Sequence, residues 1–153
     1  MTNTTDALTG AKTTQDQLGA TTLTFKEDGI ESTFKIIEVG TPGVTEVGDG
    51  LSYKANLINS NNVLVGTKDI SFVFTKQQKN GDFIAFVKET VSLPGGDIFT
   101  QGSINANKLE DLIPQRIDIV GGTGIYANAQ GKETITQLDR NVEDVANISL
   151  KIV

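Results

Sequence analysis

Two tight-turn signals divide residues 51–93 into three strand-like segments, and the stretch reads LSYKANLINSNNVLVGTKDISFVFTKQQKNGDFIAFVKETVSL. Apolar and polar residues alternate over 51–58 and over much of 63–75, as expected for strands that bury one face. Residues 59–62 are rich in Asn, and residues 79–82 read Lys-Asn-Gly-Asp, which is typical of hairpin turns. The stretch therefore predicts three consecutive antiparallel strands, the third over 83–93.

The segments on either side extend the same pattern. After the turn at 94–97, strands are predicted over 98–104, 115–120, 132–138 and 146–153, with one helical turn within 105–112 and a Gly-rich loop over 121–131. Before residue 51, the pattern predicts a loop over 40–50, a largely buried strand over 32–39 and a turn at Asp28-Gly29, while 21–25 either forms a short strand or extends the N-terminal tail. The chain is therefore predicted to be all-β, with an eight-stranded antiparallel β-barrel of calycin-like form as its architecture; strand spacing alone would also suit a two-sheet sandwich.

Length and composition restrict the function. The 153 residues suit one domain, which we expect to span 21–153 after a flexible N-terminal tail over 1–20. The chain contains neither Cys nor His, which excludes thiolate catalysis and the usual Ser–His arrangements and argues against a metal site or other cofactor. The formal charge of −6 argues against nucleic acid as a partner. No apolar run is long enough for a membrane span and no basic start precedes an apolar run, so we expect a cytoplasmic protein that does not bind membranes.

Strand parity nominates the residues that face the interior. It groups Tyr53 with Ala55 and Leu57, and it places their polar neighbours Lys54 and Asn56 on the outer face. By the same rule Phe72 and Phe74 share one face, Glu133, Ile135 and Gln137 share another, and Glu89 lies with Val87. A Glu inside the barrel must be paired or protonated, and its pKa then suits acid–base chemistry. The other interpretation puts Glu133 at a rim, bonded to Lys or Arg.

The Gly121-Gly122-Thr123-Gly124 run superficially matches a phosphate-binding loop. A strand precedes it, but neither a helix nor a Lys-Ser/Thr pair is predicted after it. We therefore interpret it as a tight structural connection.

Several motifs in order resemble the allene oxide cyclase and dirigent-like family. These are Val47-Gly48-Asp49, Leu57, Val65-Gly66-Thr67, residues 93–102 with their Pro-Gly-Gly-Asp-Ile start, and, most specifically, residues 120–126 (VGGTGIY) followed by Ala129-Gln130-Gly131. The resemblance runs from about Phe34 to the C-terminus and implies an allene-oxide-cyclase-like eight-stranded antiparallel barrel, often oligomeric, with an apolar cavity. The Glu, Asn and Cys of allene oxide cyclases are replaced here near Lys35, Ile37 and Phe72. The resemblance is therefore nearest to the bacterial spirotetronate-type cyclases, which form rings by [4+2] addition.

The resemblance implies a cyclase or isomerase that folds a linear, mostly apolar, polyketide-like precursor in the barrel and closes a ring. Tyr53, Glu133 and Gln137 are the predicted catalytic residues, acting by hydrogen bonds to a substrate carbonyl, and the predicted substrate contacts are Phe72, Phe74, Val87, Ile117, Ile119 and Ile135. No metal or organic cofactor is required, and the partner is a small apolar molecule.

The alternative is a non-catalytic or dirigent-like barrel that binds a small apolar ligand. We also expect a homo-oligomer, a dimer or trimer, with Ile84 and Phe86 as an outward apolar patch.

Overall fold

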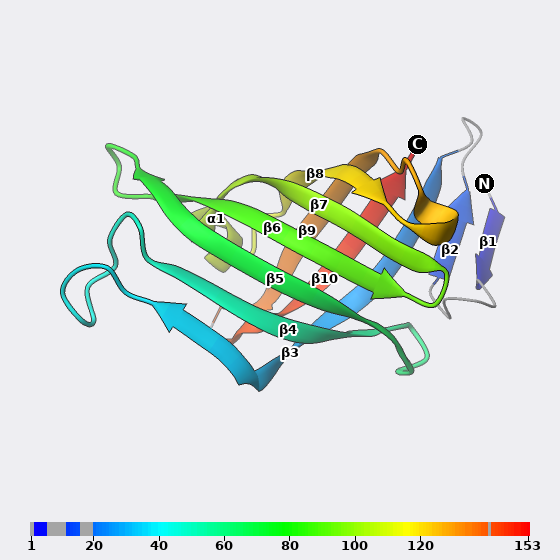
Figure 1. The fold of residues 1–153 in the computed structure, drawn as a ribbon, viewed down its shortest axis with the longest axis horizontal. Helices are drawn as coiled ribbons and strands as arrows, with labels where there is room; N and C mark the ends of the chain where they lie inside the picture. The colour runs from blue at the N-terminus through cyan, green and yellow to red at the C-terminus, as the bar shows by residue number, and fades with distance from the viewer. Residues whose placement is uncertain (1, 6–11, 16–19, 141) are drawn as a thin grey trace.

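A computed structural model describes residues 2–5, 12–15, 20–140 and 142–153, and most of them belong to β-strands (Figure 1). In chain order the elements are β1 (Thr2–Thr5), β2 (Lys12–Gln15), β3 (Thr21–Ile37), β4 (Gly50–Ile58), β5 (Leu64–Gln77), β6 (Phe83–Leu93), β7 (Gly96–Asn105), the short helix α1 (Ala106–Glu110), β8 (Gln115–Gly122), a 3₁₀ turn (Gly124–Tyr126), β9 (Gly131–Asp139) and β10 (Val142–Ile152). Within the described ranges, no helix is long and apolar enough to cross a bilayer.

The eight strands β3 to β10 close into a barrel. Their order is β3-β10-β9-β8-β7-β6-β5-β4, and β4 pairs back with β3, so the sheet has no open seam between its first and last strands. All of these pairings are antiparallel. The predicted eight-stranded antiparallel barrel is therefore confirmed, and the closure excludes the sandwich that strand spacing left open.

The first barrel strand differs from the prediction. The sequence predicted a break at Asp28-Gly29 and a buried strand over 32–39, whereas β3 runs without interruption over Thr21–Ile37. Residues 21–28 pair with β10, and residues 26–37 pair with β4 through a register shift between Ile30 and Lys35. The pairing with β10 ends at Asp28, so the end of β3 has a partner on one side, which explains why Ile36 and Ile37 are 73% and 56% exposed. The predicted turn was wrong because Asp28 and Gly29 pair within the sheet, and the predicted burial was wrong because the end of β3 lacks a second neighbouring strand.

Two short strands lie in the segment expected to be a flexible tail. β2 pairs with the start of β3, and β1 pairs with β2, so both extend the sheet beside the closed barrel. The rest of that expectation falls on residues 1, 6–11 and 16–19, which lie outside the described residues.

The Gly-rich connection between β8 and β9 packs tightly against the turn between β6 and β7. Gly124 has φ +58°, and a Cβ on it would meet the Gly95 carbonyl oxygen at 2.3 Å. A Cβ on Gly96 would meet the Thr123 carbonyl oxygen at 2.1 Å, so these two positions need glycine. The run leads into a 3₁₀ turn and then a strand, in agreement with its interpretation as a structural connection.

Side-chain parity follows the prediction on the regular strands. On β9 the buried residues are Glu133, Ile135 and Gln137, while Lys132 is exposed. The apolar interior consists mainly of inward residues from all eight strands: Leu23, Phe25, Ala55, Leu57, Ile70, Ala85, Val87, Val91, Ile98, Ile104, Ile117, Ile119, Ile135, Ala146, Ile148 and Leu150. These residues pack the barrel and surround a small polar centre.

Candidate functional site

A lysine lies at the centre of this polar group. Lys68 on β5 has the same parity as Ile70, so the alternation of the strand turns its side chain inward, where it is 1% exposed. The same alternation turns Glu27 on β3, Glu89 on β6 and Glu133 on β9 inward. All three glutamates are less than 9% exposed, so four ionisable side chains from four strands meet inside the barrel.

The ammonium group of Lys68 contacts all three carboxyl groups. Its Nζ lies 2.6 Å from Glu133 Oε2 and donates a hydrogen bond to it. It lies 2.8 Å from Glu89 Oε1 and 2.8 Å from Glu27 Oε1. Two hydroxyl groups complete the cluster: Thr100 Oγ1 donates to Glu89 Oε1 at 3.1 Å, and the Tyr53 hydroxyl donates to Glu27 Oε2 at 3.4 Å. A buried lysine of this kind is stable only because it is paired.

The environment separates the protonation states of two of these carboxyl groups. Burial, and then repulsion from Glu133, raises the pKa of Glu89 well above its usual range. Burial also acts to raise the pKa of Glu133, but the Lys68 charge and hydrogen bonds from Glu89, Lys68 and Thr100 hold it below the usual value. Glu89 is therefore the carboxyl group that keeps a proton, and Glu133 is the carboxylate that pairs with Lys68.

Lys68 and Tyr53 also keep their protons. Burial would lower the pKa of Lys68, but the charges of Glu133, Glu27 and Glu89 outweigh it and raise this pKa well above its usual value. Burial and the nearby Glu27 charge raise the pKa of Tyr53. Lys68 is thus an ammonium ion rather than a free-amine nucleophile, and Tyr53 is a neutral hydroxyl donor.

A cavity of about 500 Å³ extends from this cluster toward the α1 end of the barrel. At its inner end lie Glu27, Tyr53 and Glu89, and its mouth includes residues of α1 and the exposed end of β3. Apolar side chains form most of the wall: Phe34, Leu51, Ile70, Phe72, Phe74, Phe83, Ala85, Val87, Ile104, Leu109, Ile135 and Ala146. The rings of Phe34 and Tyr53 stack with centroids 4.6 Å apart. The site is thus an apolar chamber with a hydrogen-bonding floor.

The cavity brings together most of the residues nominated from sequence. Tyr53, Phe72, Phe74, Val87, Ile135 and Gln137 all line it. The Gln137 amide donates to the Asp139 carbonyl oxygen at 2.8 Å, which fixes its orientation. Glu133 lies in the buried cluster next to the floor, so of the two interpretations of this residue the interior one holds and the rim one does not. Ile117 and Ile119 are buried in the core on β8 and are not among the described residues that line the cavity.

Three charged or acidic residues of the cluster, besides Thr100, were not nominated as site residues. Glu89 was placed on the inner face without a role, while Lys68 and Glu27 were overlooked. The available signal was parity, because Lys68 is in phase with Ile70 and Phe72, and Glu27 is in phase with Leu23 and Phe25. Three inward acids in one chain imply a buried cation.

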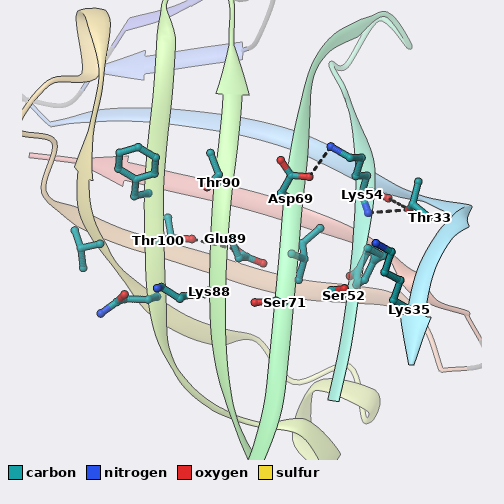
Figure 2. Close-up of a pocket in the computed structure, with 15 residues that line it drawn as sticks. Thr33, Lys35, Ser52, Lys54, Asp69, Ser71, Lys88, Glu89, Thr90 and Thr100 are labelled. Atoms are coloured by element: carbon teal, nitrogen blue, oxygen red, sulfur yellow. Dashed lines mark hydrogen bonds and ion pairs between the residues drawn. The ribbon is translucent and has the colours of Figure 1, made fainter. Parts of the chain in front are cut away.

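A second concavity, of about 810 Å³, lies on the outer face of β3 to β7 and is open to solvent (Figure 2). Most of its side chains come from the opposite parity and are polar, among them Thr33, Ser52, Ser71 and Lys88. Four residues of the inward parity also border it: Tyr53, Ile70, Glu89 and Thr100. The Lys54 Nζ–Asp69 Oδ1 ion pair crosses it at 3.0 Å, with both side chains more than half exposed. Figure 2 also shows Glu89 bonded to Thr100, which belongs to the interior face. The outer groove therefore lacks the enclosure and the apolar wall of the inner cavity.

Together the fold and the site define a closed antiparallel barrel with a ligand-sized interior cavity. Residues 30–150 match the family described as "Allene oxide cyclase barrel like domain", and the chain belongs to this family. No curated protein sequence matches the chain.

Solved structures with the same fold include enzymes and dirigent proteins. A pyocyanin demethylase is 25% identical, with a TM-score of 0.72 over 86% of this chain and 99% of its own. An exo-specific intermolecular Diels-Alderase, AbnU, is 15% identical, with a TM-score of 0.72 over 87% of this chain and 97% of its own. The pterocarpan synthase dirigent protein GePTS1 is 16% identical, with a TM-score of 0.64 over 87% of this chain and 82% of its own. For AbnU and GePTS1, the similarity to this chain is a similarity of fold.

Proposed function

We propose that this protein is a cyclase or isomerase that folds a linear, mostly apolar natural-product precursor inside the barrel and closes a ring, as in a [4+2] cycloaddition. The observation that carries the proposal is the apolar cavity of about 500 Å³ that ends at Tyr53 and Glu89. Its volume lies within the range of roughly 300–1,000 Å³ typical of small-molecule sites. Ring closure of this kind rearranges bonds within one molecule and needs no electron donor or acceptor.

The main contribution of the protein is positional. A chain held in a folded shape by rigid strands has its reacting ends close together, and good positioning supplies about 7–11 kcal/mol of a reaction barrier. The aromatic wall residues Phe34, Phe72, Phe74 and Phe83 offer broad flat surfaces against which an unsaturated chain packs. The shape of this wall then sets the stereochemistry of the product.

The polar side chains at the inner end of the cavity polarise the substrate. Glu89 retains its proton, which is directed to Glu133 in the site without ligand. Because Glu89 also borders the cavity, a bound carbonyl oxygen can accept this hydrogen bond in place of Glu133, which withdraws electron density from a conjugated alkene. Tyr53 is a second neutral donor at the same end. Gln137 lies on the wall and provides an amide contact. Glu133, predicted from sequence as a direct contact, acts in this proposal through Glu89 and Lys68, because it is fully buried next to them.

The relatives support small-molecule chemistry in this barrel. The similar structures named above include one titled a Diels-Alderase and another titled a demethylase of pyocyanin, the latter matching nearly its entire length. Both are enzymes by name.

The proposal is tested with a synthetic linear substrate that carries a 1,3-diene at one end and an alkene conjugated to a carbonyl at the other. Cyclisation leaves the mass unchanged, so chromatography with mass detection separates product from substrate, and a chiral column reports the stereochemical excess. We expect faster conversion than in buffer, with one dominant stereoisomer. The Ile135→Trp variant, in which the indole occupies the cavity, is expected to return the reaction to the buffer rate.

The second candidate function is a barrel that binds a small apolar ligand without converting it. The dirigent protein structure among the similar folds favours keeping this candidate. It predicts saturable binding of the same linear substrate, lost in Ile135→Trp, with a conversion rate and isomer ratio equal to those in buffer.

A further inference from the structure

The floor of the cavity carries more acid than base. Three carboxyl groups, from Glu27, Glu89 and Glu133, surround the single ammonium of Lys68. With Glu89 protonated, two acids still face one base in a region shielded from water. The other strand neighbours of the cluster supply the hydroxyl groups of Thr100 and Tyr53, which carry no positive charge. The inner end of the cavity is therefore a region of negative potential.

Two carboxyl groups of this cluster have an oxygen without a hydrogen-bond partner among the described residues, and of these only Glu27 borders the cavity, since Glu133 does not line it. Glu27 is 3% exposed. Its Oε1 lies 2.8 Å from Lys68 Nζ but accepts no hydrogen bond from any described residue. Its Oε2 accepts one long bond, at 3.4 Å, from Tyr53. Oε1 is fully buried and ion-paired with Lys68, whereas Oε2 is held by one long bond, so Oε2 is the oxygen at which a donor supplied by a ligand is favoured.

We infer that the ligand of this cavity is a mostly apolar molecule that carries a protonated amine or another cationic N–H group, placed against Glu27 and Glu89. This inference deepens the proposed function, because it names a substrate class for the same cavity. The ligand nitrogen would donate a hydrogen bond to Glu27 Oε2, whose bond from Tyr53 is long, and would offset the excess of acid. The Tyr53 and Phe34 rings, which border the same end, would contact the cation through their faces.

The same arrangement discriminates against anions. A carboxylate at the inner end would lie among like charges, and Lys68 is already engaged by three glutamates and is itself buried behind the floor. The exposed lysines of the outer groove, Lys35, Lys54 and Lys88, lie on the opposite face of the sheet and do not change the sign of the interior. Fatty-acid-like ligands with a free carboxylate are therefore expected to be excluded.

Three soluble probes of similar size test the inference: benzylammonium, benzyl alcohol and benzoate. Each is titrated into the full-length protein with labelled Ile methyl groups, and binding is followed by NMR at Ile135 and Ile104, which line the cavity. We expect benzylammonium to bind about tenfold more tightly than benzyl alcohol, since each factor of ten corresponds to about 1.4 kcal/mol, and benzoate to leave both methyl signals unshifted. Equal affinity for the cation and the alcohol, or tighter binding of benzoate, would overturn the inference.

Two matched substitutions locate the effect. Glu27→Gln is expected to bring the affinity ratio of cation to alcohol close to one. Glu31→Gln, at an exposed position that lines neither the cavity nor the outer groove, is expected to keep the wild-type ratio. If Glu27→Gln does not fold, the three wild-type titrations still decide. Cation preference without ring closure would contradict the cyclase proposal alone, and ring closure without cation preference would contradict this inference alone.

Discussion

Removal of the buried lysine is the most informative perturbation of this fold. In Lys68→Met a side chain of similar length replaces the ammonium that contacts Glu27, Glu89 and Glu133 at 2.6–2.8 Å. Breaking a buried ion pair by removing one partner costs about 3–5 kcal/mol, because the other charge stays buried without compensation. For a domain of this size that loss corresponds to a melting temperature lower by about 10 °C.

The assay is urea unfolding of the wild type and the variant, monitored by far-ultraviolet circular dichroism at neutral and at acid pH. The variant's deficit should shrink at acid pH, because the glutamates left without Lys68 then fold in their neutral forms. Lys54→Met is the matched control, since Lys54 forms an exposed ion pair with Asp69, a type that contributes about 0–1 kcal/mol. Equal costs for the two substitutions, or a deficit at Lys68 that does not change with pH, would refute the assignment of Lys68 as the cation that holds the interior acids.

Four further predictions concern this site and the outer face of the barrel. Because the pKa of Glu89 is raised, its stabilising effect is fully present below the ordinary glutamate pKa and is lost as the pH rises from there through the raised pKa, so Glu89→Gln should flatten the fall in unfolding free energy over that interval. The pKa of Glu133 is lowered, so its ionised form stabilises the fold above the ordinary glutamate pKa, and this stabilisation is lost on acidification. Glu133→Gln should therefore lower the unfolding free energy at neutral pH. Chemical denaturation of both variants over a range of pH checks the direction of each effect. Ile135→Trp should keep the wild-type circular dichroism spectrum yet abolish ligand binding, as calorimetry with the best cavity ligand would show; full retained affinity would place the site elsewhere. Sedimentation velocity at micromolar concentration should show a dimer or trimer, whereas a monomer would remove the expected self-association through Ile84 and Phe86.

The alternation of apolar and polar residues was sufficient to predict most strands of the barrel. Period-two alternation on β4, β5 and β9 correctly placed Tyr53, Phe72, Phe74 and Ile135 inside, because a regular antiparallel strand with one buried face fixes side-chain direction. The Gly-rich run at 121–124 was correctly separated from nucleotide loops, since one 3₁₀ turn and then a strand follow it, and not an α-helix. The barrel closure itself depends on the pairing of β3 with β4, and strand spacing alone did not distinguish it from a sandwich.

Prediction from sequence failed where pairing between distant strands overrides the local composition. Asp28-Gly29 has the composition of a turn, but β10 and β4 hold it within β3. Ile36 and Ile37 have the composition of a core strand, but they extend past the pairing with β10 and are exposed. Lys68 contacts Glu27, 41 positions earlier, and Glu89 and Glu133, 21 and 65 positions later, so no local window contains the cluster, although parity on each strand was available to predict it.

The protonation state of Glu89 tests the account most directly, because the floor of the cavity acts as a hydrogen-bond donor only if this carboxyl group keeps its proton. Carbon-13 NMR of the glutamate carboxyl carbons, with the Glu89 signal assigned by its absence in Glu89→Gln, follows each group as the pH is raised. The account predicts that Glu89 remains protonated well above the ordinary glutamate range, while Glu133 ionises below it. Ionisation of Glu89 together with the exposed glutamates would contradict it.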